Sequence, residues 1–91
     1  MSVNKNLLFI PTYNEKKNIL PLINKIKKYV KFKYDILFVD DNSIDGSKEI
    51  FNKLKEKNIL IINRKKKLGI GSAHKAAIKF AYKNNYHYLI S

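Results

Sequence analysis

The sequence predicts an α/β domain with a mainly parallel sheet, built in the order β-α-β-α-β-α-β. Four short runs are apolar at successive positions, which is typical of strands covered on both faces. The segments between them are apolar at helical spacing, so each is expected to be an amphipathic helix. This order favours parallel strands joined by right-handed crossovers. With 91 residues and no internal linker, the chain is expected to be one domain, residues 1–91.

The four predicted strands are brief. They read LLFI, ILFV, ILII and YLI, at residues 7–10, 36–39, 59–62 and 88–90. No apolar run approaches the roughly 20 residues that span a bilayer. The chain has no cysteine, which excludes disulfides and thiolate metal sites.

Three helices are predicted between the strands. We expect the first to begin near Leu20, after a separate turn at residues 14–18, because Pro21 is tolerated only in a first turn. The second has Asp45 as its N-cap and Glu49 in its first turn, both favourable near the positive end of the helix dipole. The third carries small side chains that would let it lie close to the sheet: Ala73, Ala76, Ala77 and Ala81.

The charge is large and uneven. The formal net charge is +12, and residues 57–91 hold seven Lys, Arg64 and no acid. A basic segment suits phosphate-rich partners. However, Lys, Asn and Ile make up 42 of the 91 residues, a bias that A/T-rich coding would produce by itself. Most of the lysines are therefore interpreted as solvated surface.

The few acids are more informative. Three of the seven, Asp40, Asp41 and Asp45, fall within six residues directly after the second predicted strand. Ligands of parallel α/β sheets bind at the carboxyl ends of the strands. Helix capping explains Asp45, but it does not explain an adjacent pair of acids at a strand end. Asp40 and Asp41 are therefore predicted to bind a nucleobase, ribose hydroxyls or a cation.

Two further loops reach the same edge of the sheet. PTYNE follows the first strand, where the Tyr13 ring can lie against a nucleobase. NRKKKLGIGS follows the third strand, and its basic side chains and the next helix N-terminus suit a phosphate. The Gly69-x-Gly71 pair lacks the third glycine of a dinucleotide fingerprint, and no P-loop pattern is present. Neither His74 nor His87 has a second His or Cys at ligand spacing, so neither is assigned to metal binding or catalysis.

The segments FIPTYNEKKNI, ILFVDDNSIDGS and RKKKLGIGSAHKAAIKFAYKNNYHYLI resemble the N-terminal half of family 2 glycosyltransferases. Within this group they look most like polyprenyl-phosphate (dolichyl-phosphate) mannose synthases. The resemblance runs from about Leu7 to Ile90. It implies an incomplete GT-A (Rossmann-like) three-layer fold. The implied activity is transfer of a sugar, mannose from GDP-mannose, to a membrane polyprenyl phosphate with inversion at the anomeric carbon.

Eight residues from the three loops are predicted to bind the nucleotide sugar: Pro11, Tyr13, Glu15, Val39, Asp40, Asp41, Arg64 and Lys67. The resemblance implies that the first three contact the base and ribose and that the next three line the other side of the nucleoside. The last two are assigned to the donor diphosphate from their charge. No catalytic residue is assigned.

The resemblance also implies a cofactor, Mg²⁺ or Mn²⁺, held by a D-x-D motif after the fourth strand. The sequence has no acid after Glu56 and stops at Ser91, so the D-x-D ligands and the acceptor-binding half are not expected in it. We expect these 91 residues to bind the donor without transferring the sugar alone, and to associate with a C-terminal half. The expected location is the cytoplasm, at the cytoplasmic face of a membrane.

Three alternatives stay open. The first is a truncated, non-catalytic nucleotide-binding chain. The second is a receiver domain, but that class needs an aspartate at a strand end some forty residues after the acid pair, where this chain reads KNNYHYLIS. The third is a basic RNA-binding module. Its aromatic residues match no RNA-binding motif and its apolar runs are those of buried strands, so no nucleic-acid partner is expected.

Overall fold

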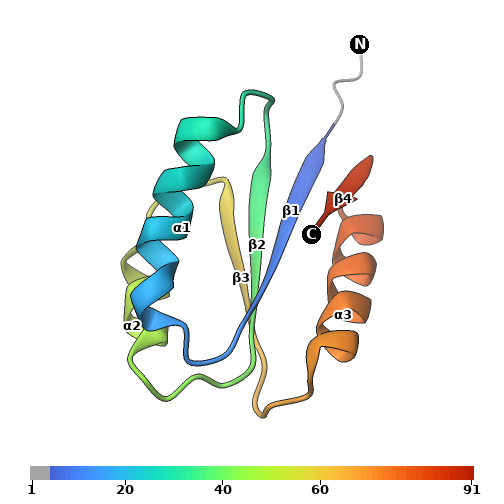
Figure 1. Ribbon diagram of the computed structural model, residues 1–91. Helices are drawn as coiled ribbons and strands as arrows, with labels where there is room; N and C mark the ends of the chain where they lie inside the picture. Colours follow the sequence, from blue (N-terminus) through green and yellow to red (C-terminus); the bar gives the residue numbers. More distant parts are fainter. Residues whose placement is uncertain (1–4) are drawn as a thin grey trace.

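The computed structural model describes residues 5–91 and has the predicted β-α-β-α-β-α-β order (Figure 1). The strands form one sheet in the order β3-β2-β1-β4, and every neighbouring pair is parallel. The α/β prediction is therefore confirmed. The elements are β1 (Asn6–Thr12), α1 (Lys16–Tyr29), β2 (Asp35–Asp40), α2 (Ser47–Lys53), β3 (Ile59–Asn63), α3 (Ile70–Lys83) and β4 (Tyr88–Ile90).

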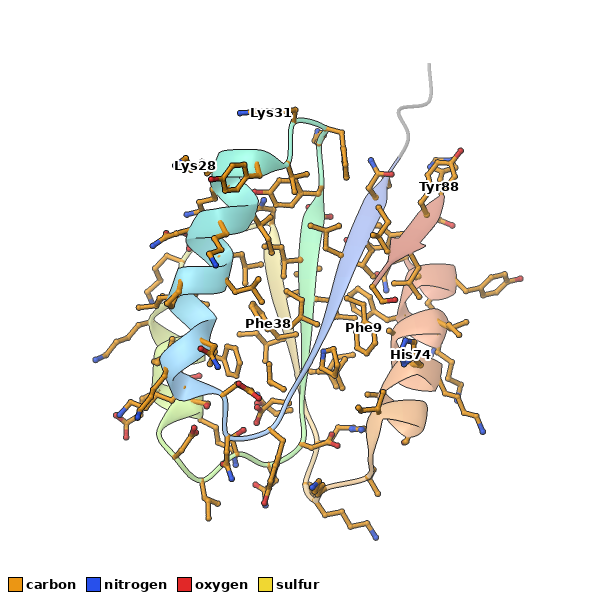
Figure 2. The ribbon with its side chains drawn as sticks, in the orientation of Figure 1. Phe9, Lys28, Lys31, Phe38, His74 and Tyr88 are labelled. Carbon is orange, nitrogen blue, oxygen red and sulfur yellow. The ribbon has the colours of Figure 1, made fainter. Side chains whose placement is uncertain are left out.

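Helices cover both faces of the sheet. Helices α1 and α2 lie on one face and α3 on the other (Figure 1). Side chains alternate along β2 as the pleat requires. Leu37 and Val39 pack in the α3 layer, whereas Ile36 and Phe38 pack in the α1–α2 layer. Figure 2 shows Phe38 on the side of β2 that faces α1. This arrangement gives the successive apolar positions of β2 their buried environment on both faces.

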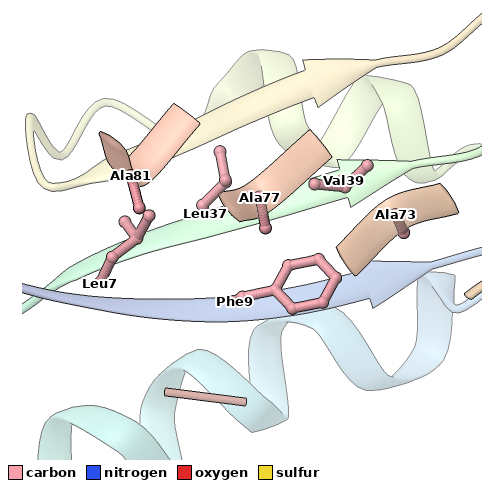
Figure 3. Packing of buried hydrophobic residues seen from close by; sticks show 7 residues of the cluster. All are labelled: Leu7, Phe9, Leu37, Val39, Ala73, Ala77 and Ala81. Atoms are coloured by element: carbon pink, nitrogen blue, oxygen red, sulfur yellow. The ribbon is translucent and has the colours of Figure 1, made fainter. Parts of the chain in front are cut away.

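The alanine stripe of α3 faces the sheet as predicted. Ala73, Ala77 and Ala81 are at most 8% exposed and pack over Leu7 and Phe9 of β1 (Figure 3). The Phe9 ring also meets the His74 ring edge to face, with 4.8 Å between centroids (Figure 2). His74 is therefore part of the packing between α3 and the sheet.

The predicted start of the first helix is wrong. Helix α1 is continuous from Lys16, and Pro21 lies inside it, with no separate turn before it. Proline cannot donate to the carbonyl four residues back, which here belongs to Lys17. That carbonyl lies in the first turn on an exposed residue, where water can take the place of the missing donor. Buried Ile19 and Ile23 anchor the helix on both sides of the proline.

The predicted N-cap at Asp45 is off by one residue. Gly46 occupies the cap position of α2 with φ 96°, and the Asp45 side chain lies one residue earlier. Its Oδ1 accepts hydrogen bonds from Ser47 N at 3.0 Å and from Ser47 Oγ at 2.5 Å. Its Oδ2 accepts from Lys16 N at 2.9 Å, at the start of α1. Asp45 therefore joins the first turns of both helices on this face.

The edge strand β4 pairs only with Asn6, Leu7 and Leu8 of β1. The rest of that edge of β1 has no strand partner among residues 5–91, and the loop that follows β1 borders an open space there. None of the helices in the described part of the chain has the length and apolar character needed to cross a membrane.

Candidate functional site

The loops that follow β1, β2 and β3 meet at one edge of the sheet. Thr12 Oγ1 donates to Asp40 Oδ1 at 2.7 Å, and Asp41 N donates to Thr12 O at 3.0 Å. Arg64 N donates to Asp40 O at 2.8 Å, which continues the pairing of β2 with β3. These bonds hold the three predicted binding segments side by side.

An open cleft of about 250 Å³ lies where these loops meet the start of α3. Five of the eight predicted residues line it: Pro11, Tyr13, Glu15, Asp41 and Lys67. Val39, Asp40 and Arg64 are not among its lining residues. The cleft is completed by four residues that were not predicted: Thr12, Gly69, Ile70 and Ala73. All four lie inside or next to the PTYNE and LGIGSA segments, so extending the site to every residue of those segments would have found them.

The two adjacent acids have different surroundings. Asp40 has no exposed surface, and its carboxylate accepts from Thr12 Oγ1 at 2.7 Å, Ser43 N at 2.9 Å and Ser43 Oγ at 2.6 Å. It connects the first two loops through Thr12 and Ser43. The side chain of Val39 is equally buried, beneath α3 (Figure 3). Only Asp41 reaches the cleft.

Asp41 is 6% exposed and binds the basic loop, the segment of residues 64–69 between β3 and α3. Its Oδ1 accepts from Arg64 Nε at 2.5 Å, and its Oδ2 accepts from Leu68 N and Gly69 N, each at 3.1 Å. Burial alone would raise the pKa of Asp41. The Arg64 hydrogen bond, the two backbone N–H groups and the Arg64 charge together outweigh burial, so the pKa of Asp41 lies below its ordinary value. The carboxyl is therefore ionised at neutral pH.

Arg64 is not among the residues that line the cleft. Its Nη1 donates to Ser72 Oγ at 2.7 Å and its Nη2 donates to the Gly69 carbonyl at 3.2 Å, in addition to the Asp41 contact. The guanidinium thus joins the loop after β2, the basic loop and the first turn of α3. The contact with Ser72 was not predicted, because the sequence separation of the two residues does not show that their side chains meet.

Lys67 and Tyr13 close one side of the cleft. The Lys67 ammonium lies 4.6 Å from the centroid of the Tyr13 ring, which is a cation–π distance. Both residues are exposed, so each can exchange this contact for a ligand. Gly69 precedes α3 with φ 90°, and Gly69 and Ile70 at the start of the helix line the cleft. An aromatic face, a carboxylate, an ammonium and a helix N-terminus therefore surround one space.

These groups suit a nucleoside phosphate. A base can lie against Tyr13, the carboxylates of Asp41 and Glu15 can accept hydrogen bonds from the base and the ribose, and Lys67 with the helix N-terminus can neutralise phosphate. A metal site does not fit the same residues. Within residues 5–91, no three His, Cys, Asp or Glu side chains gather closely enough to hold a cation. Asp41 is already bound to Arg64.

Comparisons with known proteins found a matching family model and several similar proteins. The family model described as Glycosyl transferase family 2 matches residues 7–90. A polyprenol monophosphomannose synthase of Mycolicibacterium smegmatis is 33% identical over 89 residues, covering 94% of this chain and 33% of that protein. A dolichol-phosphate mannosyltransferase of Saccharomyces cerevisiae is 34% identical over 96 residues, covering 99% of this chain and 34% of that protein. The chain thus spans about a third of the length of these curated relatives.

A solved structure has the same arrangement of elements. It is a mannosyltransferase of Pyrobaculum calidifontis in complex with GDP-Man and Mn²⁺, with a TM-score of 0.72 and 20% identity. The match covers 86% of this chain and 24% of that chain. At this identity the likeness concerns the fold alone, and it confirms the predicted incomplete GT-A (Rossmann-like) fold.

Proposed function

The chain belongs to glycosyl transferase family 2, and on that premise we propose that its cleft binds a nucleotide sugar, with GDP-mannose as the donor. The observation that carries this proposal is the meeting of Tyr13, Asp41 and Lys67 in one cleft at the start of α3. The names of two relatives support mannose as the sugar and a polyprenyl phosphate as the acceptor. The GDP-Man bound to the structural neighbour supports the donor.

Each part of the donor has a partner in the cleft. The guanine lies against the Tyr13 ring, which gives up its contact with Lys67. A carboxylate has about four lone-pair positions, and Asp41 uses three of them on Arg64, Leu68 N and Gly69 N. The remaining position, on Oδ1, accepts an N–H of guanine. Glu15 accepts from the ribose hydroxyls.

The diphosphate binds Lys67 and the first N–H groups of α3. In the complete protein an oxygen of the acceptor phosphate attacks the anomeric carbon of mannose. The bond from that carbon to the β-phosphate oxygen breaks, and its electron pair leaves with GDP. The acceptor oxygen is already anionic, so the rate depends on positioning and on stabilising the leaving diphosphate. Lys67 contributes to the second requirement. No step is assigned to a metal, because the described residues do not form a site for one.

The 91 residues are proposed as the donor-binding part of the transferase, acting in the cytoplasm at the cytoplasmic face of a membrane that holds the lipid acceptor. We expect the isolated chain to bind GDP-mannose and to transfer no mannose. Mannosyl transfer to a polyprenyl phosphate by the purified 91 residues would contradict this division of labour.

Isothermal titration calorimetry tests the proposal. GDP-mannose and GDP should bind at least about tenfold more tightly than UDP-glucose, because the base contacts discriminate between them. Tyr13→Ala should weaken GDP-mannose binding, whereas Tyr82→Ala, at an 86% exposed tyrosine outside the cleft, should leave it unchanged. A single-stranded RNA should bind only at low salt, since charge-driven binding fades as salt rises. If the chain has a native circular dichroism spectrum but binds no nucleotide, the proposal is refuted.

A further inference from the structure

Arg64 is bound on three sides. Its side chain is 10% exposed, and three of its nitrogens donate to Asp41, Ser72 and the Gly69 carbonyl. All these acceptors belong to the walls of the cleft or to the first turn of α3. A guanidinium engaged in this way has little freedom to reach a ligand, in contrast to the exposed Lys67.

We propose that Arg64 is a positioning residue, which holds the Asp41 carboxylate and the start of α3 in the arrangement that binds the nucleoside, and that it does not bind the donor diphosphate. This inference rests on the proposed function of the cleft. It replaces the assignment of Arg64 to the diphosphate, which was based on charge alone.

The hydrogen bonds of Asp41 and Arg64 connect the position of the carboxylate to the start of α3. Asp41 Oδ2 accepts from Leu68 N and Gly69 N, so the position of this carboxylate fixes the end of the basic loop. Gly69 turns the chain into α3 with a positive φ, and Arg64 binds its carbonyl from the other side. Removal of the guanidinium therefore leaves the carboxylate with its two backbone donors alone and takes one support from the start of α3.

Removal also changes the electrostatics of Asp41. Besides Asp41, the charged residues that line the cleft are Lys67 and Glu15. Asp40 is next to Asp41 in the sequence, but its carboxylate is bound to Thr12 and Ser43. Without Arg64, burial acts on Asp41 with only two backbone N–H groups to oppose it. The carboxyl should then take up a proton at a higher pH than in the wild type.

The test compares the nucleoside with the nucleotide. Guanosine and GDP are titrated by NMR into the wild type, Arg64→Gln, Arg64→Lys and Lys67→Gln, with Lys66→Gln as the control in the same loop. Arg64→Gln should lower the affinities for guanosine and GDP by the same factor, about 10- to 100-fold. Lys67→Gln should lower the affinity for GDP without lowering that for guanosine, because guanine displaces Lys67 from the Tyr13 ring. Arg64→Lys should recover little, because an ammonium cannot reproduce the planar fork.

A second readout needs no ligand. The carboxyl ¹³C shift of Asp41 is followed against pH in the free wild type and in Arg64→Gln, and the midpoint should rise in the variant. A loss of GDP affinity with guanosine affinity retained in Arg64→Gln would overturn the proposal, as would an unchanged Asp41 midpoint. If the wild type binds neither guanosine nor GDP, the proposed function fails, and the Asp41 midpoint alone supports or overturns the hold of Arg64 on the carboxylate.

Discussion

The buried carboxylate of Asp40 should contribute more to stability than any other acid among the described residues. It has no exposed surface and accepts from Thr12 Oγ1, Ser43 N and Ser43 Oγ at 2.6–2.9 Å. Asp40→Ala leaves these three donors without their acceptor. A buried donor left unsatisfied costs about 1–3 kcal/mol. Relaxation of the two hydroxyls toward other partners lowers the sum, so we expect a total loss of about 3–5 kcal/mol.

That loss is a large part of the roughly 5–15 kcal/mol by which domains of this kind are stable. Thr12→Val removes one donor and keeps the shape of the side chain, so it should cost about 1–2 kcal/mol. In the Asp40→Ala background Thr12→Val should cost almost nothing more, because its acceptor is already absent. The pair therefore forms a double-mutant cycle whose coupling reports the Thr12–Asp40 hydrogen bond.

Urea unfolding followed by far-ultraviolet circular dichroism measures these differences. Glu49→Gln, at an exposed acid in the first turn of α2, is the control and should cost less than about 1 kcal/mol. If Asp40→Ala costs no more than this control, or if the two changes at Thr12 and Asp40 are simply additive, the structural role assigned to Asp40 is wrong.

Three further predictions concern stability. Gly69→Ala should lower the free energy of unfolding in urea by about 1–3 kcal/mol. The cause is backbone strain at φ 90°, because no atom lies within 4 Å of the added Cβ to clash with it. An unchanged free energy of unfolding would contradict this strain. Pro21→Ala should stabilise the fold by about 1–2 kcal/mol, because the helical donor gained by the Lys17 carbonyl outweighs the freedom that the unfolded chain gains. A lower urea midpoint would contradict this. The pKa values of Asp41 and Asp45 lie below their ordinary value of 3.8, so their stabilising contribution is present above that pH and is lost as pH falls through the lower folded values. A urea midpoint that stays constant from pH 5 to pH 2 would contradict this last prediction.

The order of elements was predictable because each strand of this sheet carries its own signal. Successive apolar positions predicted all four strands, and the alanine spacing predicted the face that α3 turns to the sheet. The start of α1 was not predictable in the same way. Propensity weighs against Pro21 inside a helix, whereas the burial of Ile19 and Ile23 and the Asp45 contact at Lys16 N stabilise the longer helix.

The binding segments were identifiable, but the roles of single side chains were only partly so. Side chains alternate along a strand, so Asp40 continues the Ile36 and Phe38 face of β2, away from the α3 layer that borders the cleft. Arg64 binds Asp41 and Ser72, which lie in separate segments of the chain, so no local sequence pattern predicts these contacts. Arg64 was assigned to the ligand from its charge alone, whereas in the structure its guanidinium donates to Asp41, Ser72 and the Gly69 carbonyl.

The most direct test of the cleft as a nucleotide-sugar site is an NMR titration of the ¹⁵N-labelled chain with GDP-mannose. We predict saturable amide shift changes at Tyr13, Asp41 and Gly69, with little change at the opposite end of the sheet, around Lys33 and Tyr88. Shift changes spread over exposed lysines that vanish as salt is raised, or no change at millimolar GDP-mannose, would contradict a nucleotide-sugar site in this cleft.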